Sequence, residues 1–162
     1  MYQLTDEDRL ALAELSVALR LSLAERSEVV RWADARIQAS PEAPPDWLVE
    51  LSLSNQLRIL DLTGLLRRLA SDVPVESICR RALNRLRRDL TTSYEDIAML
   101  AHQIYRVVGD VMQWDFRNPL MSDATWMDDM FGLVDDGYYT RDQAMDNFDD
   151  FCRKYLSPSS SR

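Results

Sequence analysis

The 162-residue chain is poor in the residues on which most catalytic and metal sites depend, with one histidine, two cysteines and four glycines. A single histidine excludes motifs that need two, such as His-Glu-x-x-His. The cysteines, Cys79 and Cys152, have no metal-ligand spacing around them. Each falls on the apolar side of an expected helix, so we expect buried thiols in a reducing compartment and no disulfide.

Long apolar runs are also missing, so no membrane span is predicted. The first residues are acidic and lack the basic start of a secretory signal, so we expect a cytoplasmic location. With four glycines and six prolines the chain has few helix breakers, which favours long helices over a fold with many turns.

Basic charge is concentrated in one part of an acidic chain whose net charge is −8. Residues 1–57 hold 10 acids and 5 bases, residues 58–88 hold 3 acids and 8 bases, and residues 89–162 hold 14 acids and 6 bases. All bases except Lys154 are arginine, which we attribute to codon usage in a GC-rich genome. The net charge argues against non-specific nucleic-acid binding and against anionic membranes, and it is compatible with a basic protein partner.

Apolar residues recur at helical spacing along most of the chain, which predicts an all-α fold: a compact bundle of about six or seven helices in one domain over residues 1–156. Residues 157–162 are serine-rich and are expected to be a disordered tail. The expected helices begin after the caps Thr5, Ser22, Pro45, Ser54 or Asn55, Asp72, Ser93, Ser122 or Asp123, and Thr140. The first helix is apolar on most sides, so it is either the core of the bundle or a contact in a homodimer.

The strongest basic feature is a predicted helix from Pro74 to Leu90. Its arginines Arg81, Arg85 and Arg88 align at i, i+4 and i+7, with further arginines beside them. This basic ridge has three interpretations: a solvated face, a partner for the acidic C-terminal half, or a phosphate contact. It has no interleaved aromatic residues and no glycine-rich loop, so we favour the first two interpretations.

Aspartates dominate the last third of the chain, as the pairs Asp128-Asp129 and Asp135-Asp136 and a cluster at Asp146, Asp149 and Asp150. A spacing of seven places Asp128 with Asp135, and Asp129 with Asp136, on similar sides of one helix. Helical Mg²⁺-dependent hydrolases of phosphorylated small molecules use carboxylates in such patterns, so this activity is one alternative. An EF-hand is excluded here, because a loop aligned on Gly137 lacks its first, third and twelfth ligands. Gly137 is instead predicted to end a helix as a C′ glycine.

His102, the only histidine, is predicted on the outer side of a helix over 94–114, away from its apolar stripe. No nucleophile elbow accompanies it, so we expect a surface histidine. The start of this helix resembles a helix-turn-helix, but the apolar period continues without a break and the surroundings are acidic.

Aromatic and methionine side chains are interspersed among the aspartates, as in a surface that binds a basic protein. Trp126, Met130 and Phe131 are expected in the core. We therefore predict a non-enzymatic interaction module without a cofactor, for example an immunity or inhibitor protein for a basic effector. Its predicted partner-binding residues are Met127, Asp128, Asp129, Asp135, Asp136, Tyr138 and Tyr139. Nucleic-acid binding through the basic ridge is the third alternative.

Overall fold

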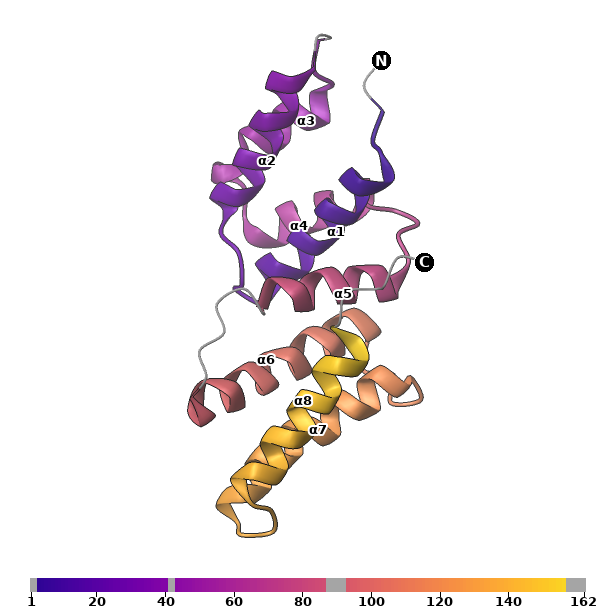
Figure 1. Cartoon of the computed structure of the whole chain (residues 1–162). Helices are drawn as coiled ribbons and strands as arrows, with labels where there is room; N and C mark the ends of the chain where they lie inside the picture. Colours follow the sequence, from indigo (N-terminus) through magenta and orange to yellow (C-terminus); the bar gives the residue numbers. More distant parts are fainter. Residues whose placement is uncertain (1–2, 41–42, 87–92, 157–162) are drawn as a thin grey trace. The chain divides into compact units, whose positions relative to one another are not determined.

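The computed structural model describes residues 3–40, 43–86 and 93–156, and these ranges confirm the all-α prediction. They hold eight α-helices, slightly more than expected, one 3₁₀ helix and no strand (Figure 1). The elements are α1 (Asp6–Arg20), α2 (Arg26–Ala39), α3 (Asp46–Ser52), η1 (Ser54–Gln56), α4 (Ile59–Leu69), α5 (Val75–Leu86), α6 (Tyr94–Met112), α7 (Pro119–Asp135) and α8 (Arg141–Tyr155). None of these helices is long and apolar enough to cross a membrane.

The chain divides into two compact units, residues 1–78 and residues 79–162, and the boundary falls inside α5. The sequence-based expectation of a single domain over 1–156 stays a prediction. The expected tail, residues 157–162, lies outside the described residues.

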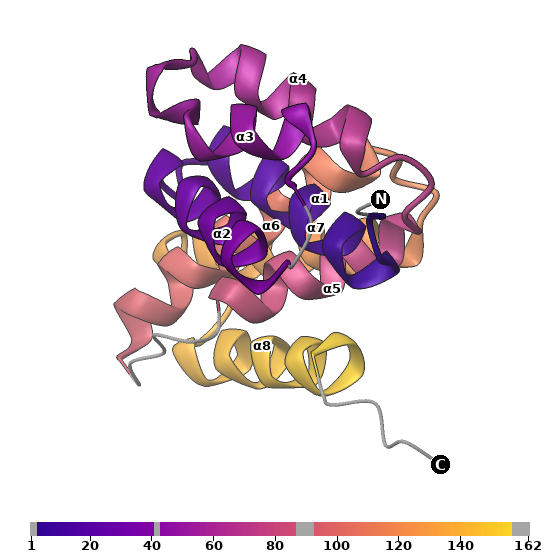
Figure 2. The same cartoon turned by 90° about the horizontal axis from the view of Figure 1, so that it is seen from above.

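Unit 1 is built from two pairs of helices, α1 with α4 and α2 with α3, and η1 packs on α2 (Figure 2). Its core includes Leu12, Leu15 and Leu19 of α1, which confirms the expectation that this helix contributes to the core. Asp8, only 2% exposed, is held by the Thr5 cap and by Arg36 of α2, whose Nη2 lies 2.8 Å from its Oδ1. This buried charge therefore ties the first two helices together.

Unit 2 contains α6, α7 and α8, and each of these helices packs on the other two. Figure 1 shows α7 and α8 side by side as a hairpin. Their inward faces are apolar and follow helical spacing. The buried residues of the three helices include Ile97, Ala101, Ile104, Val108, Ala124, Met130, Phe131, Ala144, Phe148 and Phe151.

Four predicted helix starts are confirmed and three are corrected. The structure has Pro45 as the cap of α3, as expected. Thr5, Ser93 and Thr140 each accept a hydrogen bond from the backbone N–H three residues later. The α2 cap is Glu25, and Ser22 has a left-handed φ of 59°. Residues 54–56 form a 3₁₀ turn, so α4 starts after Arg58. The α7 cap is Asn118, because Pro119 suits the first helical position, where no N–H is needed.

Gly109 is the glycine with a close side-chain neighbour. A Cβ on Gly64, inside α4, would meet only Arg68 Nη1, at 3.9 Å. A Cβ on Gly109 would lie 2.3 Å from the Trp114 ring. Gln113 and Trp114 both have positive φ, and this turn folds the indole back over the end of α6. Gly109 is therefore the position where only a glycine fits beneath the indole.

Candidate functional site

The exposed side of α7 differs from the sequence prediction at two neighbouring residues. Met127, predicted at the partner-binding surface, is completely buried. Trp126, predicted in the core, is 48% exposed. Adjacent helical residues point about 100° apart, so turning the buried face by a fraction of a turn exchanges the two. The prediction for Met127 is thus wrong, and Trp126 takes its place on the surface.

The turn after α7 carries the two predicted tyrosines. Gly137 has a φ of +79°, and the N–H groups of Gly137 and Tyr138 donate to the carbonyls of Val134 and Leu133. This is the Schellman arrangement, and it confirms the predicted C′ glycine. Tyr138 is 74% exposed, and the Tyr139 ring meets Trp126 edge to face at 6.0 Å between centroids. The contact between Tyr139 and Trp126 therefore holds the turn against the outer side of α7.

The four predicted aspartates of α7 occupy two rows, as their spacing predicted. Asp128 and Asp135 are on the side toward α6: Oδ2 of Asp128 lies 3.2 Å from Nδ1 of His102, and the charge of Asp135, which is itself exposed, acts on Tyr94. Asp129 and Asp136 are exposed. The structure describes no ion pair for either of them, so their charge faces solvent.

Asp135 acts on Tyr94 at the start of α6. Burial raises the pKa of Tyr94, and the negative charge of Asp135 raises it further. Arg141 opposes this effect, because its guanidinium carbon lies 4.5 Å from the centre of the Tyr94 ring. The same arginine lies 3.4 Å from Glu95. Arg141 therefore links the start of α8 to the start of α6.

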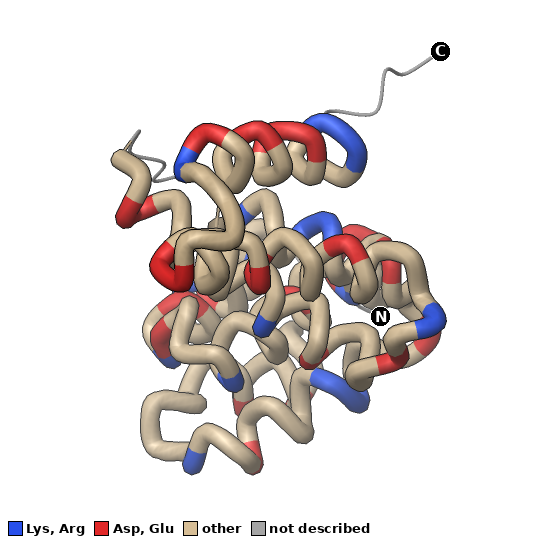
Figure 3. Tube along the Cα trace, turned by 90° about the horizontal axis from the view of Figure 1, so that it is seen from below, with Lys and Arg blue, Asp and Glu red and all other residues tan. Residues whose placement is uncertain are grey.

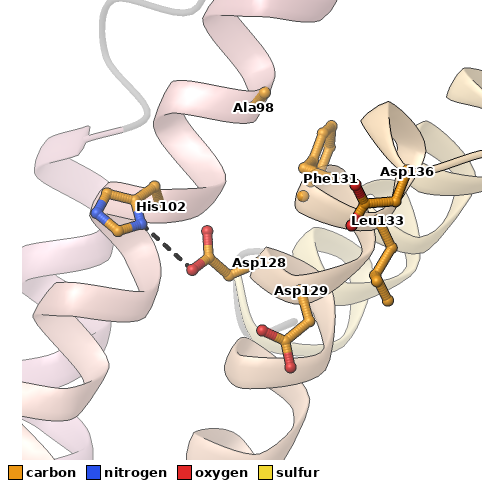
Figure 4. A pocket seen from close by; sticks show the side chains of 8 residues that line it. Ala98, His102, Asp128, Asp129, Phe131, Leu133 and Asp136 are labelled. Carbon is orange, nitrogen blue, oxygen red and sulfur yellow. Dashed lines mark hydrogen bonds and ion pairs between the residues drawn. The ribbon is translucent and has the colours of Figure 1, made fainter.

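A shallow, open hollow of about 650 Å³ lies between α6 and α7 (Figure 4). The α6 wall is formed by Ala98 and His102. The α7 wall is formed by Asp128, Asp129, Phe131, Gly132, Leu133 and Asp136. His102 has a side chain that is 59% exposed, which confirms the prediction of a surface histidine. The hollow brings three of the seven predicted partner-binding residues together with this histidine.

The outer face of α8 carries a second acidic row, which we call the α8 ridge: Asp142, Asp146, Asp149 and Asp150, all exposed. It is opposite the buried stripe of Ala144, Phe148 and Phe151. Figure 3 shows acidic positions along α8 between basic ones at its two ends. Only Asp150 of this ridge forms an ion pair with a described residue, Arg153 at 2.7 Å.

Three residues of the α8 ridge, Asp146, Asp149 and Asp150, were recognised in the sequence as an acidic cluster, but they were not assigned to the partner-binding site, and Asp142 was not included. The signal that identifies the ridge is its spacing of four, three and one residues, which is complementary to the apolar stripe of the same helix.

One aspartate of α7 has a structural role instead. Asp123 accepts hydrogen bonds from Lys154 Nζ and from the Tyr155 hydroxyl, each at 2.6 Å. Burial alone would raise the pKa of Asp123, but these two hydrogen bonds and the lysine charge outweigh it, so the pKa lies below its ordinary value. The same contacts raise the pKa of Lys154. This cluster fastens the end of α8 to α7.

The basic ridge lies on α5, whose buried side includes Cys79, Ala82 and Leu83. Arg81 and Arg85 are partly buried on this helix, and Arg88 lies outside the described residues. Cys79 is a buried thiol as expected, whereas Cys152 is a thiol that is partly exposed. Within the described ranges, no three side chains of His, Cys, Asp or Glu are grouped so that they could hold a metal ion.

Comparison of the chain with known proteins found no matching family model, no matching curated protein and no matching solved structure.

Proposed function

We propose that this protein is a non-enzymatic interaction module that binds a basic protein through the α7–α8 hairpin. The observation that carries the proposal is an exposed tryptophan beside an exposed aspartate that forms no ion pair with a residue of the described ranges. Trp126 is 48% exposed, Asp129 follows it one turn later, and Tyr139 packs against its ring. Protein interfaces draw much of their binding energy from such aromatic side chains.

The charge of the hairpin supports the same proposal. Residues 119–150 contain nine aspartates and one arginine. Aspartates on the outer side of α7 and on the α8 ridge are exposed, and most make no ion pair with a described residue. Unpaired like charges of this kind stabilise the folded protein little, whereas they attract a basic partner and accelerate its association. An inhibitor or immunity protein that neutralises a basic effector is the specific form that we propose.

The test begins with capture of partners from the source cell on the immobilised protein, followed by association kinetics with the purified partner. We expect a basic partner whose association slows about tenfold or more between low and high salt. The double variant Asp146→Asn/Asp149→Asn should slow association at low salt. Asp46→Asn/Glu50→Gln removes the same charge from exposed positions of α3 and serves as the matched control.

Association that is independent of salt, or that both double variants slow equally, would contradict the proposal. A captured partner with an acidic surface would contradict it as well.

A further inference from the structure

Two of the residues that line the hollow between α6 and α7 have little or no side chain. Ala98 stands on the α6 wall and Gly132 on the α7 wall. A Cβ added to Gly132 would meet no atom within 4 Å. The space is therefore not filled by the folded chain, and it is accessible to a side chain from outside.

The charge of the hollow is negative on one wall. Asp128, Asp129 and Asp136 all line it, and Figure 4 shows their carboxylates along the α7 side. Among the described residues of its lining, His102 is the only basic one, and it is already within 3.2 Å of Asp128. The carboxylates of Asp129 and Asp136 are left without an ion pair among the residues that the structure describes.

The hollow also has an apolar part. Phe131 and Leu133 contribute to its lining. A guanidinium group suits such a mixed surface, because it is weakly hydrated, lies flat on apolar or aromatic groups and can bond a carboxylate through two N–H groups. A lysine ammonium is a compact, strongly hydrated charge and gains less from the apolar lining.

We propose that this hollow receives an arginine side chain of the partner protein. The inference rests on the proposed function, because it identifies which group of a basic partner the acidic hairpin takes up. Asp129 lines the hollow and lies one helical turn from the exposed Trp126, so one partner surface could reach both. An arginine seated there would lie between the carboxylates of Asp129 and Asp136 and offset one of their two charges, while the rest of the partner covers Trp126.

The first experiment needs no knowledge of the partner. Acetyl-arginine methylamide is titrated into the full ¹⁵N-labelled chain, and acetyl-citrulline methylamide serves as the neutral control of the same shape. We expect saturable shifts of the Gly132 and His102 amide signals with the arginine compound only. The variants Gly132→Leu, which fills the hollow, and Asp129→Asn/Asp136→Asn should each abolish them. Equal shifts with both compounds, or shifts confined to the α8 ridge, would overturn the inference.

The second experiment uses the partner. Gly132→Leu should weaken its binding about tenfold or more, mainly through faster dissociation, while Gly132→Ala binds nearly as the natural chain does. Both variants should retain the salt dependence of association. If association is steered by salt but Gly132→Leu binds unchanged, only the arginine site is wrong. If association shows no salt dependence, the proposed function fails, and the arginine titration still decides whether the hollow binds a guanidinium group.

Discussion

Two glycines near the end of α7 have opposite conformational roles, although they are only five residues apart. Gly132 is inside the helix, where glycine is less favourable than alanine because it loses more backbone entropy on folding. Gly137 adopts a φ of +79°, which an L-residue with a Cβ rarely adopts. A Cβ at either position would have no neighbour within 4 Å. The effect of adding a side chain at the two positions should therefore differ only through the backbone conformation.

We predict that Gly132→Ala raises the free energy of unfolding by about 0.5–1 kcal/mol. Gly137→Ala should lower it by about 1–2 kcal/mol, because the Schellman turn would be strained. Urea unfolding of both variants beside the natural chain measures the two changes. Changes of the same sign would show that one of these positions does not have the described conformation.

Residue-level prediction from the sequence succeeded for side chains whose environment is decided locally. The C′ glycine and the surface histidine were both found. Prediction failed where the burial of a side chain depends on how much of the helix surface the neighbouring helices cover. Met127 and Trp126 are adjacent, both are apolar, and either could complete the stripe of α7. The packing of α6 and α8 on that helix settles which one is buried, and a single sequence contains no signal for it.

At the scale of elements, helix starts were predicted well where a cap side chain is followed three residues later by a side chain that completes a capping box. Thr5, Ser93 and Thr140 are followed at that spacing by Asp8, Asp96 and Gln143. The starts of α4 and α7 were misplaced because polar residues cluster there. Asn118 and Ser122 are both good caps, and the proline after Asn118 decides between them by fitting the first helical turn.

The hairpin of α7 and α8 is held at one end by the Asp123–Lys154–Tyr155 cluster, and this contact should depend on pH. Because the folded-state pKa of Asp123 is lowered, its contribution is fully present above the unfolded pKa of about 3.9 and is lost as the pH falls through the folded pKa. We predict that Asp123→Asn lowers stability by about 1 kcal/mol at neutral pH, a figure discounted for a carboxylate that is 41% exposed.

Urea unfolding of the natural chain and of Asp123→Asn from pH 7 to pH 2 tests this contribution. The difference between them should shrink as the pH falls through the folded-state pKa of Asp123, because its carboxyl group then becomes neutral. A difference that persists unchanged at pH 2 would assign the effect of the substitution to packing instead.

At the scale of the whole molecule, the all-α class followed from periodicity, whereas the division into two compact units did not. The boundary lies inside α5, between Ile78 and Cys79. A helix that continues through the boundary shows no change of composition there, and no proline or glycine marks it. The usual sequence signals of a linker are therefore missing at this point.

The charge asymmetry of the chain leads to a prediction for the basic ridge. Arg81 and Arg85 are partly buried, so their aliphatic stems contribute packing as well as charge. We predict that Arg81→Gln/Arg85→Gln/Arg88→Gln lowers the free energy of unfolding by about 1–2 kcal/mol and leaves the affinity for a captured basic partner nearly unchanged. Unchanged unfolding together with lost partner binding, or with lost nucleic-acid binding at low salt, would make the ridge the binding site.

The contact between Lys154 and Asp123 has a practical consequence for protein chemistry. Lys154 is the only lysine in the chain, so its amine is the only side-chain target for acylating labels, cross-linkers and amine-reactive surfaces. The raised pKa of this amine keeps it protonated and slows such reactions. Acylation of Lys154 would remove the positive charge that pairs with Asp123, and the contact between α7 and the end of α8 would weaken. Attachment through an engineered cysteine or a terminal tag would leave that contact intact.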